Sequence, residues 1–198
     1  NDDDNDDDGA IVRHWDVFHN ISPVDPRGHY LLLPALDNTK EWRDQSLIPK
    51  DCHDVTYLAS TINPPGSMVL CFNSVGAGAS QNHIHCHAWV CPPPPLLCRD
   101  EGEYGIASDD GFCSYAVSKA SELMKTSSVM HLGNGLTVSL LDYPCTCIKL
   151  STTTWMDDDP DLKNNMTIPP GLKEMGDALS IAVGIAQKMS VPHNVAWT

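Results

Sequence analysis

Apolar and polar residues along the chain follow two patterns, one typical of strands and one typical of helices. Short apolar runs between turn-forming residues predict strands at 28–33, 67–74, 83–90, 136–142 and 146–150, and residues 193–198 begin another. Apolar residues three and four positions apart predict helices at 51–62, 111–125 and 171–189. Together these elements favour an α+β fold in which helices pack on an antiparallel sheet.

The strand predicted at 83–90 has two chemically different faces. Alternate side chains of a strand share a face, and one face here holds His83, His85, His87 and Trp89. The other face holds only apolar residues, which are Ile84, Cys86, Ala88 and Val90. Three imidazoles are costly to bury without partners. Their unperturbed pKa of about 6.5 lets them act as nucleophile, acid or base at neutral pH.

A turn of small residues precedes this strand. Gly76 and Gly78 lie in a run of alanine and serine that lets backbone N–H groups approach a ligand closely. The neutral hydrogen-bonding side chains around the turn are Asn73, Ser74, Ser80 and Asn82. We therefore expect the turn to hold phosphate oxygens beside the histidines, an arrangement that needs no basic side chains.

These residues resemble the histidine-triad superfamily of nucleotide hydrolases and transferases. Within that superfamily they are most similar to the GDP-hexose phosphorylases of the GDP-L-galactose and GDP-D-glucose type. The most specific blocks are 72–77 and 82–85. Shorter similar blocks lie at 20–24, 28–34, 142–144 and 191–195, whereas the stretch 91–135 matches poorly.

The resemblance implies covalent catalysis by the middle histidine, without a metal or a cofactor. His85 would attack the α-phosphorus of a nucleoside-diphosphate sugar and form a nucleotidyl-histidine intermediate, while His83 would orient it. Inorganic phosphate, a sugar phosphate or water would then accept the nucleotide. The residues implied in holding the phosphates are Asn73, Ser74, Gly76, Gly78, Ser80 and Asn82.

Two departures from the family pattern leave other functions open. His87 stands where phosphorylases and transferases of this superfamily usually have glutamine, and a histidine there is typical of hydrolases, where it could protonate the leaving group. We also expect the C-terminal hairpin of the family to be absent, because the sequence stops as its last strand begins. The alternatives are therefore a dinucleotide hydrolase, a non-catalytic subunit of a larger assembly, or a metal site built from the three histidines.

Charge and composition narrow the choice of partners. Much of the net charge of −14 comes from aspartates within 1–9 and 157–161, and the chain lacks the basic stripe of a non-specific nucleic-acid binder. No apolar run approaches the ~20 residues of a membrane-spanning helix. Because the first residue is asparagine, we expect a processed or partial chain, in the cytoplasm or in an organelle such as a plastid.

We expect residues 1–9 to form a disordered acidic tail and 10–198 to form one histidine-triad-like domain, with an irregular insertion rich in cysteine and proline at about 91–135. The eight cysteines match no zinc-ribbon or redox spacing, which leaves buried free thiols, one or two disulfides and a metal site as alternatives. Of the other histidines, His29 is expected to be structural or to support the residues of the site, and His53 to face solvent.

Overall fold

A computed structural model of the chain describes residues 13–23, 28–35, 37–62, 67–90, 126–142, 146–152 and 170–197. Within these ranges the fold is α+β, with two antiparallel sheets and two helices that pack together. The predicted helix at 111–125 and the predicted acidic tail lie outside the described residues.

The larger sheet has five strands in the order β1-β2-β4-β3-β8. Its strands are β1 (Trp15–His19), β2 (His29–Pro34), β3 (Met68–Asn73), β4 (Cys86–Val90) and β8 (Asn194–Trp197). The smaller sheet has the order β5-β6-β7, formed by β5 (Thr126–Gly133), β6 (Leu136–Leu141) and β7 (Cys147–Thr152). Every described pair of neighbouring strands is antiparallel, as predicted.

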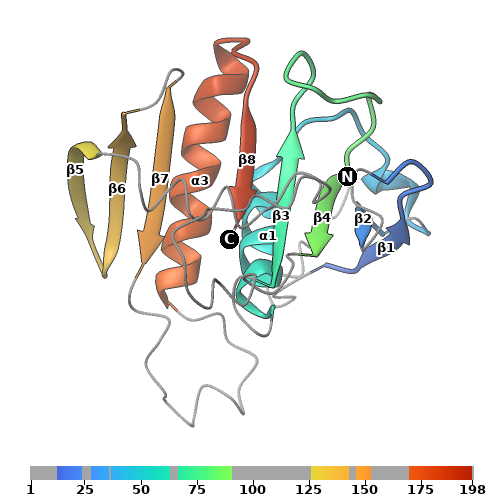
Figure 1. Cartoon of the computed structure of the whole chain (residues 1–198), viewed down its shortest axis with the longest axis horizontal. Coiled ribbons are helices and arrows are strands. Elements are labelled where there is room, and N and C mark those ends of the chain that lie inside the picture. Colours follow the sequence, from blue (N-terminus) through green and yellow to red (C-terminus); the bar gives the residue numbers. More distant parts are fainter. Residues whose placement is uncertain are drawn as a thin grey trace, which may run out of the picture.

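The two described helices are α1 (Pro49–Ser60) and α3 (Pro170–Lys188), and a single 3-10 turn covers Thr39–Glu41. Both helices confirm the predictions at 51–62 and 171–189. Figure 1 shows them between the two sheets, with α3 next to β7 and α1 beside β3 and β8. No helix in the described part of the chain has the length and apolar character required to cross a membrane.

The main core lies between the five-stranded sheet and the helices. One face of the sheet supplies Leu32, Leu70, Phe72, Cys86 and Ala88, and Ile84 lies just before β4; all six are buried. Val55 of α1 and Val183 of α3 pack into the same cluster. The apolar face predicted for the histidine strand is therefore confirmed as a core face for three of its four residues, since Ile84 and Cys86 are fully buried and Ala88 is 1% exposed, whereas Val90 is only partly buried.

Two predictions about elements need correction. The strand predicted at 83–90 begins only at Cys86. The stretch 91–135 was expected to be irregular, but Thr126–Gly133 is a strand that pairs with β6. All eight residues of β5 are exposed. A strand with no buried face has no reason to alternate apolar and polar residues, so the sequence gives no strand signal there.

The helices approach each other closely at Gly176. A Cβ atom at this position would overlap the imidazole of His53 on α1. His53 also places its Nε2 atom 3.0 Å from Oδ1 of Asp177 on α3. The expectation that His53 faces solvent is therefore wrong, because its ring fills the contact between the two helices.

Candidate functional site

The sheet face opposite the core carries a row of aromatic rings. His29 pairs with Trp89 and Leu31 pairs with His87, so β2 and β4 present His29, His87 and Trp89 on the same side. The rings of His87 and Trp89 are stacked: their centroids are 5.5 Å apart and their planes differ by 7°. The His85 ring meets the His87 ring edge-on at 4.9 Å. The structure thus brings two of the three triad histidines together.

A hydrogen bond between the ring of His85 and the backbone fixes the orientation of this side chain. The residue is 6% exposed, and its Nδ1 atom lies 2.7 Å from the backbone oxygen of His83. Because a carbonyl oxygen can only accept, Nδ1 must carry the hydrogen of this bond. In the neutral imidazole the lone pair then lies on Nε2. That lone pair is the group with which a histidine attacks phosphorus.

His83 does not join the other two rings. Its ring lies edge-on against Trp42, with the centroids 5.8 Å apart. The backbone of His83 precedes β4, so the alternation of a strand does not govern its side chain. The part of His83 that contacts His85 is its carbonyl oxygen, which fixes the His85 ring.

His29 belongs to the ring row, and the sequence predicted that it is structural or supports the residues of the site. It is 3% exposed, and its Nε2 atom lies 2.9 Å from Nδ1 of His87. Burial, followed by the nearby His85 and His29, lowers the pKa of His87 to about 4. His87 is therefore neutral at pH 7. The pairing of His29 with Trp89 across β2 and β4 depends on register, which the sequence alone does not reveal.

The small-residue turn lies directly after β3, as predicted. Gly76 and Gly78 have φ values of 81° and 106°, which favour glycine. No atom lies within 4 Å of the position that a Cβ would take at Gly78, whereas Gly76 faces Pro192. The turn therefore has open space at Gly78, where a ligand could approach the backbone.

The polar residues around the turn mostly bind protein groups. The Ser74 backbone N–H donates to the His193 carbonyl at 3.0 Å, and the Ser74 hydroxyl accepts from the His193 N–H at 2.8 Å. Asn82 accepts from the Gln45 N–H at 3.2 Å and donates to Asp44 at 3.1 Å. Ser80 is exposed. Ser74 and Asn82 thus hold neighbouring segments to the turn, a role that sequence reasoning did not assign to them.

Gln45 explains why β4 begins at Cys86. The last pair between β3 and β4 is Cys71 with His87, and the same register would continue with Phe72 opposite Cys86 and then Asn73 opposite His85. The Gln45 side chain fills this place instead. Its Nε2 donates to the carbonyls of Asn73 at 2.9 Å and His85 at 3.0 Å, and its Oε1 accepts from the His85 N–H at 2.8 Å. One amide group therefore separates the two strands where the site begins.

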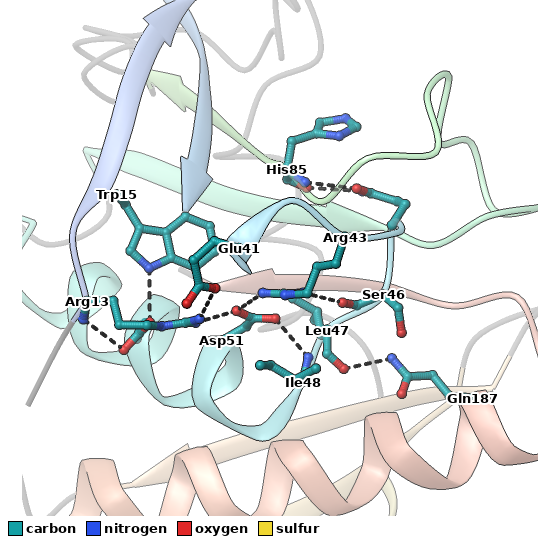
Figure 2. A network of polar contacts seen from close by, with 12 residues as sticks. Arg13, Trp15, Glu41, Arg43, Ser46, Leu47, Ile48, Asp51, His85 and Gln187 are labelled. Carbon is teal, nitrogen blue, oxygen red and sulfur yellow. Dashed lines mark hydrogen bonds and ion pairs between the residues drawn. The ribbon is translucent and has the colours of Figure 1, made fainter. Parts of the chain in front are cut away.

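A buried ionic network supports the loop that carries Gln45 (Figure 2). Arg43 pairs with Asp51 of α1 and donates to the Ser46 carbonyl at 2.8 Å. Arg13 also pairs with Asp51, and it binds Asp54 at 2.7 Å and Glu41 at 2.6 Å. One sequence signal was available. Asp51 lies four residues before Val55 on the apolar side of α1, where a carboxylate is buried only with partners.

A hollow of about 310 Å³ lies beside the turn. It is lined by Gln45, Ser46, Ser74, Val75, Gln187 and residues 190–193. None of the three triad histidines lines it. The expectation that the turn holds phosphate oxygens beside the histidines is therefore not met at this hollow.

The cysteines of the described region are free thiols, and they are Cys52, Cys71, Cys86 and Cys147. Burial raises the pKa of Cys52 and of Cys71 to about 12, so both stay protonated at neutral pH. The remaining cysteines lie outside the described residues. Within the described ranges, no three His, Cys, Asp or Glu side chains come together in a group that could hold a metal ion.

Comparisons with known proteins add no relative. No family model, no curated protein and no solved structure matches the chain.

Proposed function

We propose that the chain is a nucleotidyl phosphorylase or transferase that uses His85 as its nucleophile. The observation that carries this proposal is the bond from His85 Nδ1 to the His83 carbonyl, which leaves the lone pair on Nε2. A free histidine in water exchanges between two tautomers and many orientations. His85 is already in the form that can attack phosphorus, and this lowers the entropic cost of reaching the transition state.

The proposed reaction has two displacements at one phosphorus atom. In the first, His85 Nε2 bonds to the α-phosphorus of a nucleoside-diphosphate sugar, and the bond to the β-phosphate oxygen breaks. The sugar 1-phosphate leaves, and the nucleotide stays on the ring as a phosphoramidate. In the second, an oxygen of inorganic phosphate bonds to the same phosphorus, and the bond to Nε2 breaks. A nucleoside diphosphate leaves and His85 is regenerated. The GDP-hexose substrate class comes from the resemblance in the sequence.

A neutral His87 is more compatible with a phosphorylase than the presence of a histidine at this position would indicate. A histidine at this position could protonate the leaving group, but a pKa of about 4 leaves almost no imidazolium at pH 7. A neutral imidazole offers one N–H donor and one lone pair, the kind of uncharged hydrogen bonding that glutamine also offers. Glutamine is the residue that phosphorylases of the similar family usually have at this position.

The test is turnover of GDP-glucose labelled with ³²P at the α-phosphorus. With inorganic phosphate, the wild-type chain should release labelled GDP; without phosphate, it should produce little labelled GMP. Substitution His85→Gln should lower GDP release on the order of 10³-fold or more, because the nucleophile is lost. The matched control is His193→Gln, since His193 also places Nδ1 near the carbonyl two residues earlier, at 2.9 Å. That variant should keep the wild-type rate.

The results that would overturn the proposal are equally direct. Phosphate-dependent GDP release that persists in His85→Gln would exclude His85 as the nucleophile. Labelled GMP that forms at the same rate with and without phosphate would identify a hydrolase.

One observation favours a second candidate, a non-catalytic subunit that keeps the fold. The hollow beside the turn contains none of the triad imidazoles, although a nucleotidyl transferase needs phosphate and nucleophile together. In this case the chain should neither turn over GDP-glucose nor bind GDP at millimolar concentration. Isothermal titration with GDP distinguishes the two candidates without an activity measurement.

A further inference from the structure

We propose that Gln45 is a positioning residue for His85, whose amide takes the place of the missing strand pair and so fixes the tautomer and direction of the imidazole. The effect on catalysis rests on the proposed function, but the effect on the ring does not. Three contacts carry the proposal, and all of them join the Gln45 side chain to the backbone of His85 or Asn73.

The backbone groups at the point where β3 and β4 stop pairing need the Gln45 amide as a hydrogen-bond partner. At Cys71 and His87 the strands still pair with each other, but at Asn73 and His85 their backbones no longer do. A buried N–H and two carbonyls would be left without partners at this point, at a cost of about 1–3 kcal/mol for each group. Gln45 is 3% exposed and satisfies all three with both of its amide protons and its oxygen. No smaller side chain can reach both strands in this way.

The position of the His85 backbone decides what its ring can do. The bond that places the lone pair on Nε2 joins the His85 ring to the carbonyl of His83, only two residues away. That contact survives only while the backbone between the two residues keeps its shape. Two contacts with the loop that carries Gln45 keep this backbone in place. One is the Gln45 amide, and the other is the hydrogen bond from the Ile84 N–H to the Arg43 carbonyl at 3.0 Å. Figure 2 shows the His85 ring pointing away from this support.

Gln45 is itself held in place by the ionic network. Arg43, two residues earlier, pairs with the fully buried Asp51, and its Nη1 donates to the carbonyl of Ser46, one residue after Gln45. The loop therefore has charged contacts on both sides of the amide. A flexible loop would not place a single glutamine between two strands, so the network and the amide act as one unit.

The experiment compares two substitutions of Gln45 by the imidazole ¹⁵N shifts of His85, assigned by their loss in His85→Gln. In the wild type, Nδ1 should show the shift of a protonated nitrogen and Nε2 that of an unprotonated one. Gln45→Met keeps the side-chain bulk and loses all three bonds, so the two shifts should move toward each other as both tautomers become populated. Gln45→Glu keeps an acceptor for the His85 N–H and loses the donor. The His85 shifts in this variant should therefore lie between those of the wild type and those of Gln45→Met.

The same variants test the catalytic consequence. Formation of the nucleotidyl-histidine in a single turnover should slow on the order of 10²-fold in Gln45→Met, because the nucleophile is no longer held in the reactive geometry. KM should change little, since Gln45 is not assigned a contact with the substrate. Gln187→Met is the matched control, because Gln187 holds the same loop through the Leu47 carbonyl at 2.9 Å rather than through His85. It should leave both the shifts and the rate unchanged.

These readouts separate the inference from the function on which it builds. Unchanged His85 shifts in a folded Gln45→Met or Gln45→Glu protein would overturn the positioning role. If the shifts move as expected but the wild type forms no adduct, the positioning role stands and the proposed function fails. Equal loss in Gln45→Met and Gln187→Met would show that the loop as a whole, and not the amide, supports His85, which would also contradict the proposal.

Discussion

The pKa of His87 shows how the surroundings of a histidine change its chemistry. The sequence placed a third imidazole beside His85, and its usual pKa would make it a proton donor at mildly acidic pH. In the structure it is half-buried between His85 and His29, and burial is the main cause that lowers its pKa. The two neighbouring imidazoles add to the effect, because a positive charge on any one of them disfavours a charge on His87.

This lowered pKa predicts a pH dependence of stability. His87 has a pKa of about 4 in the folded chain, against about 6.5 when unfolded. Between these values the unfolded chain binds the proton and the folded chain does not, so the free energy of unfolding should fall as the pH falls from 6.5 to 4. After allowance for partial exposure, we expect the loss from His87 to be about 1–2 kcal/mol.

Urea unfolding at several pH values measures this loss, and His87→Gln should remove it. The free energy of unfolding of the variant should fall less than that of the wild type over the same window. Equal losses in the two proteins would contradict the assigned pKa.

For single residues, the sequence predicts which side chains of a strand are buried, but not the contacts between residues that are distant in the chain. Alternation along the chain correctly assigned Ile84, Cys86 and Ala88 to the core. It could not predict Gln45, which lies 40 residues before His85 and in no regular element. It also misplaced the ring of His83, because that prediction assumed a strand that the inserted amide of Gln45 shortens.

At the scale of elements, the contact between α1 and α3 depends on one glycine. A Cβ at Gly176 would overlap the His53 ring, whereas Gly184 of the same helix has no atom within 4 Å of that position. Gly176→Ala should therefore lower the free energy of unfolding by about 1–3 kcal/mol through overpacking. Gly184→Ala should raise it by up to about 1 kcal/mol, because alanine favours helix.

Chemical denaturation of the two glycine variants measures both effects. The double variant Gly176→Ala with His53→Ala tests the cause, since removal of the ring should restore part of the loss. If Gly176→Ala is as stable as Gly184→Ala, the helices do not approach each other as described.

The first turn of α1 depends on a buried carboxylate. Asp51 is fully buried, pairs with Arg13 and Arg43, and accepts from the Ile48 N–H at 2.8 Å. Asp51→Asn leaves two arginines short of a charged partner, and we expect a loss of about 3–5 kcal/mol in the free energy of unfolding. Asp177→Asn, which affects a much more exposed carboxylate, should cost less than about 1 kcal/mol. Similar losses in both variants, measured by thermal unfolding, would contradict a structural role for the network.

The elements that the sequence predicted are those with one buried side. The described helices and the strands at 67–74, 136–142 and 146–150 were found close to their predicted bounds, because burial of one face imposes a period on the sequence. β5 was missed because both of its faces are exposed. The positive φ values at Gly133, Asn134 and Gly135 mark the hairpin that joins it to β6, and this turn was its clearest available signal.

For the whole molecule, the candidate site is assembled from segments that are distant in the chain. His85 depends on Gln45, Gln45 lies in a loop held by Arg43 and Asp51, and Asp51 also binds Arg13, which lies just before β1. Sequence patterns describe each segment separately, whereas these contacts exist only after the sheet and helices have formed. The nucleophile could be proposed from the sequence, but the structure that supports it could not.

The most direct test of the central claim is peptide mapping by mass spectrometry after incubation with GDP-glucose in the absence of phosphate. The sample must stay at alkaline pH, because phosphoramidates of histidine are labile in acid. We predict a guanylyl group on His85 in the wild type and in His193→Gln, and none in His85→Gln. A guanylyl group on another residue, or none under conditions in which GDP-glucose is consumed, would contradict the claim that His85 is the nucleophile.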